Sequence, residues 1–263
     1  MVVTDIDGTI VDKDSNISLN VRKTIKKLQE KGVKIILATG RMFRATYPVL
    51  EDLNLDTPII SYQGGLIKEF YGEQKTLYAK YTNVDLAHEI IDFFRSKNTH
   101  INVYVNDVLF VEKEDEYIKK YIENRNIVYK LVDDLKKLDM NGLHKVLGID
   151  KDSNKIKKLT EELKEKYENK LYIIRSTPYY CEVSNPEASK AAALCFLRDY
   201  WGFKPEEVLA IGDQDNDIDM IKAAGIGVAM GNGTPKLKEA ADFITKSVDE
   251  NGFCFAMEKF CNV

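Results

Sequence analysis

Short apolar runs alternate with longer polar or amphipathic stretches in the first third of the chain. Residues 2–4 read as a strand, and Ser18 is a plausible N-cap for a helix that stops near Gly32. Two more apolar runs follow, at residues 33–38 and 58–61. This β-α-β-α-β alternation favours a parallel sheet with right-handed crossovers.

The pattern changes after residue 65. Short strands in hairpins are predicted there, with turns at 71–74 and 106–107, followed by helices rich in lysine and glutamate such as 154–167. From residue 186 the alternation of strands and helices resumes, with helices at 188–201, after 217 and from 235, and strands at 208–212, 226–229 and 243–245. The chain is therefore expected to be α/β, with a Rossmann-like parallel-sheet core (residues 1–81 and 185–263) and an inserted α+β domain (residues 82–184).

Two acidic clusters follow predicted buried strands about two hundred residues apart. One spans residues 5–9 (Asp-Ile-Asp-Gly-Thr) and the other residues 212–217 (Gly-Asp-Gln-Asp-Asn-Asp). Ligands of open α/β sheets bind at the carboxyl ends of the strands. Carboxylates gathered there would repel one another unless a hard cation lay among them, and an oxygen-rich ligand set without histidine suits Mg²⁺.

Asp5 and Asp7 form a possible catalytic pair. Residues two apart in an extended segment point to the same side, and Gly8 permits a tight turn away from the sheet. One carboxylate could attack as a nucleophile while its neighbour donates and later accepts a proton. A polar turn is the alternative interpretation of this segment.

Three other candidates have simple structural interpretations as well. Asp213, the first residue after its strand, is the best metal ligand of the second cluster, but it could also cap the next helix. Thr39 alone could be a helix cap, and Lys190 alone could be a lysine on a helix surface.

Composition and charge narrow the classes of function. The chain has 263 residues, 44% of them hydrophobic and 30% charged, with a formal net charge of -4, so nucleic acid is an unexpected partner. A secretory signal and a membrane-spanning run are both absent from the pattern, which predicts a cytosolic location. The four cysteines lack metal-site spacing and are expected to be buried or partly buried thiols, and the three histidines are scattered.

Four ordered motifs carry a resemblance to a known family. They are D-I-D-G-T at residue 5, A-T-G-R at residue 38, the lysine after P-E-A-S at residue 190, and G-D-Q-D-N-D-I-D-M at residue 212. In this order and spacing they resemble the haloacid dehalogenase (HAD) superfamily of phosphatases, and more closely its Cof-type branch. The long insertion is similar to the large cap domain of that branch.

The resemblance implies a role for each motif. Asp5 would be the nucleophile that forms an aspartyl-phosphate, and Asp7 would be the general acid/base. Thr39 and Gly40 would donate hydrogen bonds to the phosphoryl oxygens, together with the backbone N–H of Ile6.

The charged groups of the later motifs would complete this site. Lys190 would hold Asp5 and the phosphate by its charge. Mg²⁺ would be bound by the side chains of Asp5 and Asp213 and by the backbone carbonyl of Asp7.

The resemblance also covers two neighbouring residues and contains two departures. Asn216 is similar to a phosphate-contacting residue, and Asp217 to an acid that positions Lys190 or the water molecules on the metal. Gln63 stands where the family commonly has asparagine, and Ala191 stands where it has glycine. Neither departure removes a catalytic group.

The function implied is a magnesium-dependent phosphomonoester hydrolase for a small phosphorylated metabolite, such as a sugar phosphate or a phosphorylated cofactor. A hexose phosphomutase and a non-catalytic phosphometabolite-binding protein are the alternatives. Substrate choice is expected to reside in the insertion, where Arg175, Tyr179 and Tyr180 could face the cleft or could be ordinary strand residues.

Overall fold

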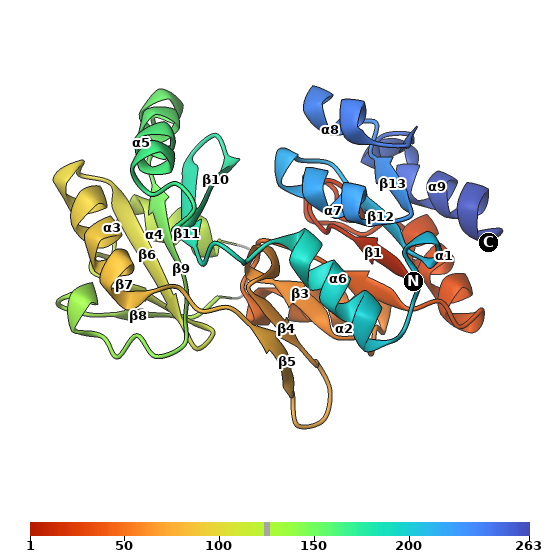
Figure 1. Cartoon of the computed structure of the whole chain (residues 1–263), viewed down its shortest axis with the longest axis horizontal. Coiled ribbons are helices and arrows are strands. Elements are labelled where there is room, and N and C mark those ends of the chain that lie inside the picture. Colours follow the sequence, from red (N-terminus) through yellow and green to blue (C-terminus); the bar gives the residue numbers. More distant parts are fainter. Residues whose placement is uncertain (124–126) are drawn as a thin grey trace. The chain divides into compact units, whose positions relative to one another are not determined.

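The computed structural model describes residues 1–123 and 127–263, and the chain divides into two compact units (Figure 1). Unit 1 consists of residues 1–41, 46–78 and 189–263, and unit 2 of residues 42–45 and 79–188. Unit 1 is therefore assembled from segments on both sides of a long insertion.

A parallel five-stranded sheet forms the centre of unit 1. Its order is β14-β13-β12-β1-β2, with β1 (Val2–Thr4) hydrogen-bonded to β12 (Leu209–Gly212) on one side and to β2 (Ile35–Leu37) on the other. The outer strands are β13 (Ile226–Ala229) and β14 (Phe243–Ile244). All three residues of β1 are buried, as expected for a central strand with helices on both faces.

Helices cover this sheet. Those of unit 1 are α1 (Leu19–Glu30), α2 (Tyr47–Leu53), α6 (Lys190–Tyr200), α7 (Ile218–Ala223), α8 (Pro235–Ala240) and α9 (Gly252–Cys261). Leu194 of α6, Ile221 of α7 and Leu237 of α8 pack in one cluster with Val3 of β1, whereas α1 and α9 contact each other. The predicted cap of α1 is confirmed, because the Ser18 hydroxyl accepts the N–H of Val21 at 3.2 Å.

A smaller antiparallel sheet continues from the parallel one. It consists of β3 (Ile59–Ser61), β4 (Leu66–Lys68) and β5 (Thr76–Ala79). A parallel bridge from Ile60 to Ala38 connects β3 to the end of β2. The predicted turn at residues 71–74 lies between β4 and β5, so this prediction is confirmed.

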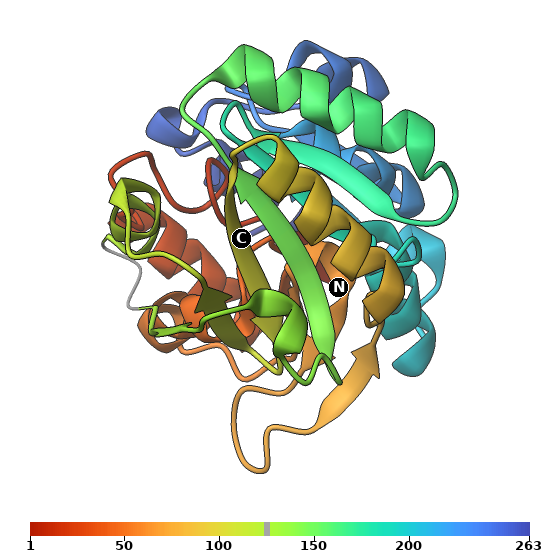
Figure 2. The same cartoon turned by 90° about the vertical axis from the view of Figure 1, so that its left-hand side faces the viewer.

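Unit 2 is an α+β unit built on one six-stranded sheet, β10-β11-β9-β6-β7-β8 (Figure 2). Its strands are β6 (His100–Val105), β7 (Val108–Val111), β8 (Tyr129–Leu131), β9 (Leu143–Ile149), β10 (Tyr172–Thr177) and β11 (Tyr180–Ser184), and its helices are α3 (Val84–Ser96), α4 (Glu116–Ile122) and α5 (Ser153–Lys166). The predicted turn between β6 and β7 is confirmed: Asn106 and Asp107 both have positive φ, at 48° and 60°.

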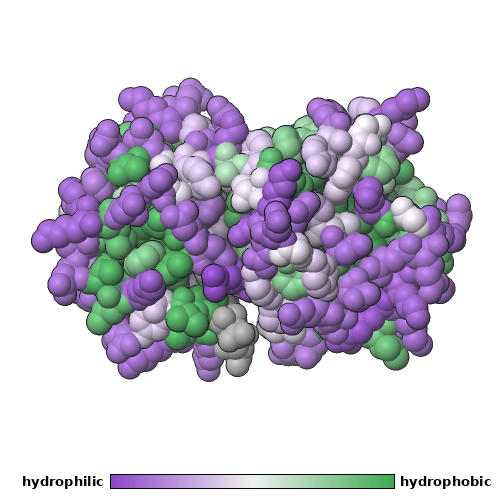
Figure 3. Space-filling view, turned by 90° about the horizontal axis from the view of Figure 1, so that it is seen from below, coloured by the Kyte–Doolittle hydropathy of each residue, from purple (hydrophilic) through white to green (hydrophobic). Residues whose placement is uncertain are grey.

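The face seen in Figure 3 is mostly hydrophilic, and hydrophobic side chains gather there over part of unit 2. The most exposed large hydrophobic residue among those described is Val128, at 82%. Within residues 1–123 and 127–263, no helix combines the length and apolar character needed to span a bilayer. Cys181 and Cys254 are buried and Cys195 and Cys261 partly buried, all as free thiols, which confirms the prediction for the cysteines.

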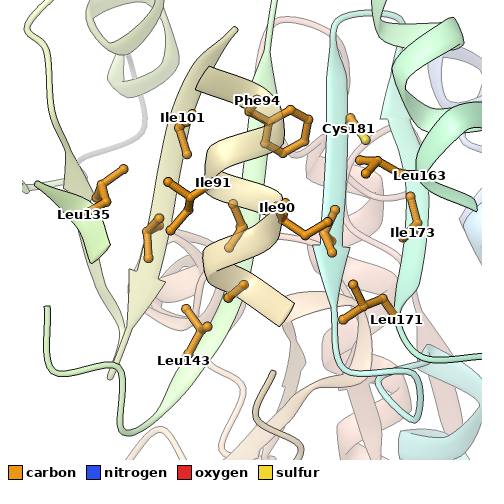
Figure 4. Close-up of a cluster of buried hydrophobic side chains, with 14 of the residues drawn as sticks. Ile90, Ile91, Phe94, Ile101, Leu135, Leu143, Leu163, Leu171, Ile173 and Cys181 are labelled. Atoms are coloured by element: carbon orange, nitrogen blue, oxygen red, sulfur yellow. The ribbon is translucent and has the colours of Figure 1, made fainter. Parts of the chain in front are cut away.

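The core of unit 2 lies between its sheet and the helices α3 and α5 (Figure 4). Ile90, Ile91 and Phe94 of α3 point toward the strands, where Cys181 of β11 belongs to the same cluster. Unit 2 therefore has a hydrophobic core of its own.

Candidate active site

The carboxyl ends of β1 and β12 place the two acidic clusters next to each other. Thr4 pairs with Ile211, and the N–H of Asp5 donates to the carbonyl of Ile211 at 2.9 Å. Asp5 and Asp213 each leave their strands at this edge, and they are 7% and 3% exposed. Segments about two hundred residues apart therefore meet where the sequence predicts.

Lys190 lies between two of these carboxylates. Its Nζ donates to Asp5 Oδ1 at 2.5 Å and to Asp217 Oδ1 at 2.6 Å, and the residue is 2% exposed. Lys190 is the first residue of α6, whose N-terminus is capped by Ser189 through the N–H of Ala192. The interpretation as a surface lysine is therefore wrong.

Both carboxylate oxygens of Asp217 accept hydrogen bonds. While Oδ1 accepts from Lys190, Oδ2 accepts the backbone N–H groups of Asp213 at 3.0 Å and Gln214 at 3.1 Å. Both carboxylate oxygens are thus engaged within the protein. Asp217 therefore binds both Lys190 and the backbone of the loop after β12.

Buried acidic groups outnumber buried basic groups at this edge of the parallel sheet. Burial raises the pKa of Asp5 well above its usual range, and the nearby carboxylates add to the effect while Lys190 opposes it. Burial likewise raises the pKa of Asp213 to about 7. Burial works against the charge of Lys190, but Asp217 and Asp5 outweigh it, so the net result is a raised pKa. One ammonium group therefore faces three buried carboxylates, an arrangement that favours a further cation.

The carboxylates can accommodate that cation. Oxygens of Asp5, Asp213 and Asp217 lie within 4.8 Å of one another. Asp213 Oδ1 is buried without a hydrogen-bond partner among the described residues, which is costly unless a ligand binds it. Gly8 permits the close approach, since a Cβ there would lie 2.4 Å from Asp213 Oδ2. Because both oxygens of Asp217 are engaged, Asp5 and Asp213 are the side chains that fit a hard divalent ion.

Asp7 has a different environment. Its side chain is 60% exposed and forms a two-point ion pair with Arg41, in which Arg41 Nε donates to Asp7 Oδ2 at 2.8 Å and Nη2 donates to Oδ1. The predicted acid/base residue is therefore accessible and held in one orientation. Arg41 itself belongs to the second motif, but sequence reasoning assigned it no role.

The predicted phosphate-binding groups surround the loop after β2. The hydroxyl of Thr39 accepts the N–H of Arg41 at 3.1 Å, which leaves its own hydrogen to be donated. Asn216 Nδ2 donates to Gln63 Oε1 at 2.9 Å, and Gln63 lies against Gly40. The link through Gln63 is a second feature that the sequence did not indicate.

The structure also places the remaining candidate residues, Ile6, Arg175 and Tyr179. Ile6 is buried between Asp5 and Asp7, and its carbonyl accepts the N–H of Val11 at 2.9 Å. In unit 2, Arg175 donates to Ser153 Oγ at 2.9 Å, and Tyr179 is 48% exposed. A role for Arg175 or Tyr179 in substrate choice stays a prediction.

This fold and site define a class of protein, and comparisons with known proteins agree with it. Residues 2–257 match the haloacid dehalogenase-like hydrolase family, and the chain belongs to that family. It is a HAD-type phosphatase of small phosphorylated substrates, with a parallel-sheet core and an inserted α+β cap.

Named relatives align over nearly the whole chain. Two Bacillus subtilis proteins, YcsE and YitU, are both named 5-amino-6-(5-phospho-D-ribitylamino)uracil phosphatase. YcsE is 31% identical, with 98% of this chain and 94% of that protein covered, and YitU is 27% identical, with 99% and 97% covered. A solved haloacid dehalogenase-like hydrolase from Bacteroides thetaiotaomicron has 31% identity and a TM-score of 0.88, with 98% of each chain covered.

Proposed function

We propose that this phosphatase is a magnesium-dependent phosphomonoester hydrolase that works through an aspartyl-phosphate on Asp5. The observation that carries the proposal is the position of Asp5 between Lys190, at 2.5 Å, and the unpartnered oxygen of Asp213. A nucleophilic carboxylate that attacks a phosphate dianion needs positive charge nearby, and both neighbours serve this need.

The first half of the proposed reaction transfers the phosphoryl group to the enzyme. Lys190 binds Asp5 Oδ1, which leaves Oδ2 as the candidate attacking atom. Oδ2 forms a bond to phosphorus while the ester P–O bond breaks, and Asp7, in a protonated form in which its two-point ion pair with Arg41 is open, gives its proton to the departing alkoxide. Thr39 and Asn216 donate hydrogen bonds to the phosphoryl oxygens, joined by the backbone of Ile6 and Gly40.

The second half releases the phosphate. Asp7, now ionised, takes a proton from a water molecule, whose oxygen attacks phosphorus as the bond to Asp5 breaks. Inorganic phosphate leaves, and both carboxyl groups return to their starting forms. Mg²⁺, held by the side chains of Asp5 and Asp213 and by the backbone carbonyl of Asp7, would supply positive charge to the transferring group.

We further propose a small phosphorylated metabolite as the substrate, either a sugar phosphate or a phosphorylated cofactor. The names of YcsE and YitU, which both specify a phosphorylated ribitylamino compound, support a small phosphorylated metabolite as the substrate. Residues 82–184, which have a hydrophobic core of their own, would form the part that selects the organic group of the substrate.

The test is phosphate release by the purified protein with MgCl₂ from p-nitrophenyl phosphate and a panel of metabolite monoesters. Asp5→Asn is expected to reduce kcat by at least about a thousandfold because it removes the nucleophile. Asp14→Asn makes the same change at an exposed site nine residues away and is expected to have no effect.

The same assay separates the alternatives. Conversion of a hexose 1-phosphate into its isomer without phosphate release would indicate a phosphomutase. Tight binding of phosphate esters without turnover would indicate a binding protein, and normal activity in the Asp5→Asn variant would rule out the mechanism.

A further inference from the structure

The segment directly after β3 has an unusual backbone. Tyr62, Gln63 and Gly64 are consecutive and all have positive φ, at 51°, 59° and 101°. This region suits glycine, but it is uncommon for a bulky residue such as tyrosine. Residues in such conformations persist only where their surroundings hold them, and they gather at functional sites.

Two of the proposed phosphate-binding segments hold this one in place. The N–H of Tyr62 donates to the carbonyl of Arg41 and the N–H of Gln63 to that of Thr39, both at 3.0 Å. On the other side, a Cβ at Gly64 would lie 2.1 Å from the carbonyl oxygen of Ser189. The segment is therefore wedged between the loop after β2 and the start of α6.

The side chain of Gln63 reaches a third segment. It is 4% exposed, and its Oε1 accepts from Nδ2 of Asn216 at 2.9 Å. The nitrogen of the same carboxamide, Nε2, would lie 2.2 Å from a Cβ at Gly40, so the amide lies directly against that glycine. One side chain thus contacts residues on two of the loops to which phosphate binding is assigned.

We propose that Gln63 is a positioning residue, whose carboxamide holds the carboxamide of Asn216 in place beside the loop of Thr39 and Gly40. The left-handed backbone directs the Gln63 side chain inward, and the bond to Asn216 restricts rotation of that amide. Asparagine, the residue expected at position 63, is one methylene shorter than glutamine, so this link depends on the residue of this particular chain. The inference rests on the proposed function, because it assumes that Asn216 contacts phosphate.

Gln63→Gly tests the link, since glycine adopts the same positive φ and the change removes only the side chain. We expect kcat/KM for p-nitrophenyl phosphate to fall about tenfold, as expected when a phosphate-binding group is misplaced. In an Asn216→Ala background the same change should cost less than about twofold, because the residue through which Gln63 acts is gone.

Gln74→Gly is the matched control. Gln74 is also a glutamine with positive φ, at 50°, but its side chain binds Tyr47 and the carbonyl of Phe70 near the β4–β5 turn. This variant should keep kcat/KM within about twofold of the wild type. If the site needed only the left-handed turn and not the glutamine side chain, both glycine variants would keep full activity, and the proposal would be wrong.

Binding of inorganic phosphate, measured with MgCl₂ by the rise in unfolding temperature, supplies a readout independent of turnover. We expect Gln63→Gly to weaken phosphate binding and Gln74→Gly to leave it unchanged. If the wild type does not hydrolyse esters, the proposed function fails, yet weaker phosphate binding in Gln63→Gly would still support the link. Full kcat/KM in Gln63→Gly, losses that multiply with Asn216→Ala, or equal phosphate affinity in wild type and Gln63→Gly would each overturn it.

Discussion

Asp217 shows how one buried residue can hold a charged neighbour in place. Its two oxygens accept from Lys190 and from two backbone N–H groups, and it is 0% exposed. Lys190 in turn depends on Asp217 and Asp5 for compensation of its charge. Removal of one member of such a buried set leaves a neighbour uncompensated, and this loss is costly.

We therefore predict that Asp217→Asn lowers the free energy of unfolding by about 3 kcal/mol. The substituted amide has one oxygen and one NH₂ group, so it cannot accept from Lys190 and from the backbone amides at once. Urea unfolding measures the change. Asp215→Asn is the control, because Asp215 is exposed and accepts only from Thr234 Oγ1, a bond that an amide oxygen can keep; equal losses in the two variants would contradict the prediction.

The ion pair between Arg41 and Asp7 leads to a second prediction. Lysine cannot form the two-point contact of a guanidinium group, so Arg41→Lys should leave the Asp7 carboxylate poorly oriented. We expect kcat to fall about tenfold with KM nearly unchanged, measured by steady-state kinetics. Arg44→Lys, which alters an arginine paired with Asp107 of unit 2, should have little effect.

These residues also mark how far the sequence predicts the candidate site. Asp5 and Asp213 could be located because each stands directly after an apolar run, whereas Lys190 was assigned only through the resemblance to the family. Arg41 could not be assigned from spacing, since its partner is 34 residues away and the pairing depends on where two loops cross. Gln63 stood out only as a departure from the family pattern, and its bond to Asn216 was missed because a left-handed backbone at a non-glycine residue has no sequence signature.

The elements of unit 1 are short, and several glycines determine how closely they pack. Helix and strand positions followed the apolar periodicity well, as for α1 and β12. No element was assigned to residues 252–261, which form α9. The local pattern predicts a parallel sheet, but it gives neither the order of the strands within that sheet nor the contact of Gly64 with the start of α6.

Gly64→Ala is predicted to destabilise unit 1 by at least about 2 kcal/mol. The new methyl group would have to displace the backbone at Ser189, and φ at this position is +101°. Thermal or urea unfolding measures the loss. Gly72→Ala is the matched control, with φ of +67° but nothing within 4 Å of the added Cβ, and it should cost only about 1 kcal/mol.

For the chain as a whole, a bound ion would tie together strands that come from opposite ends of the sequence. MgCl₂ at about a hundred times its dissociation constant is predicted to raise the unfolding temperature by about 5 °C, since the folded state alone has the site. Asp213→Asn should abolish the rise, and KCl at equal ionic strength serves as the control. The same rise in the Asp213→Asn variant would place the ion elsewhere.

The position of β1 also matters while the protein is being made. The strand before Asp5 lies between β2, which is synthesised soon after it, and β12, which ends about two hundred residues later at Gly212. At 5 to 20 residues per second, roughly ten to forty seconds pass before that second neighbour is synthesised. A nascent chain therefore holds Asp5 on an unfinished sheet edge, and a prematurely terminated fragment lacking β12 should be inactive.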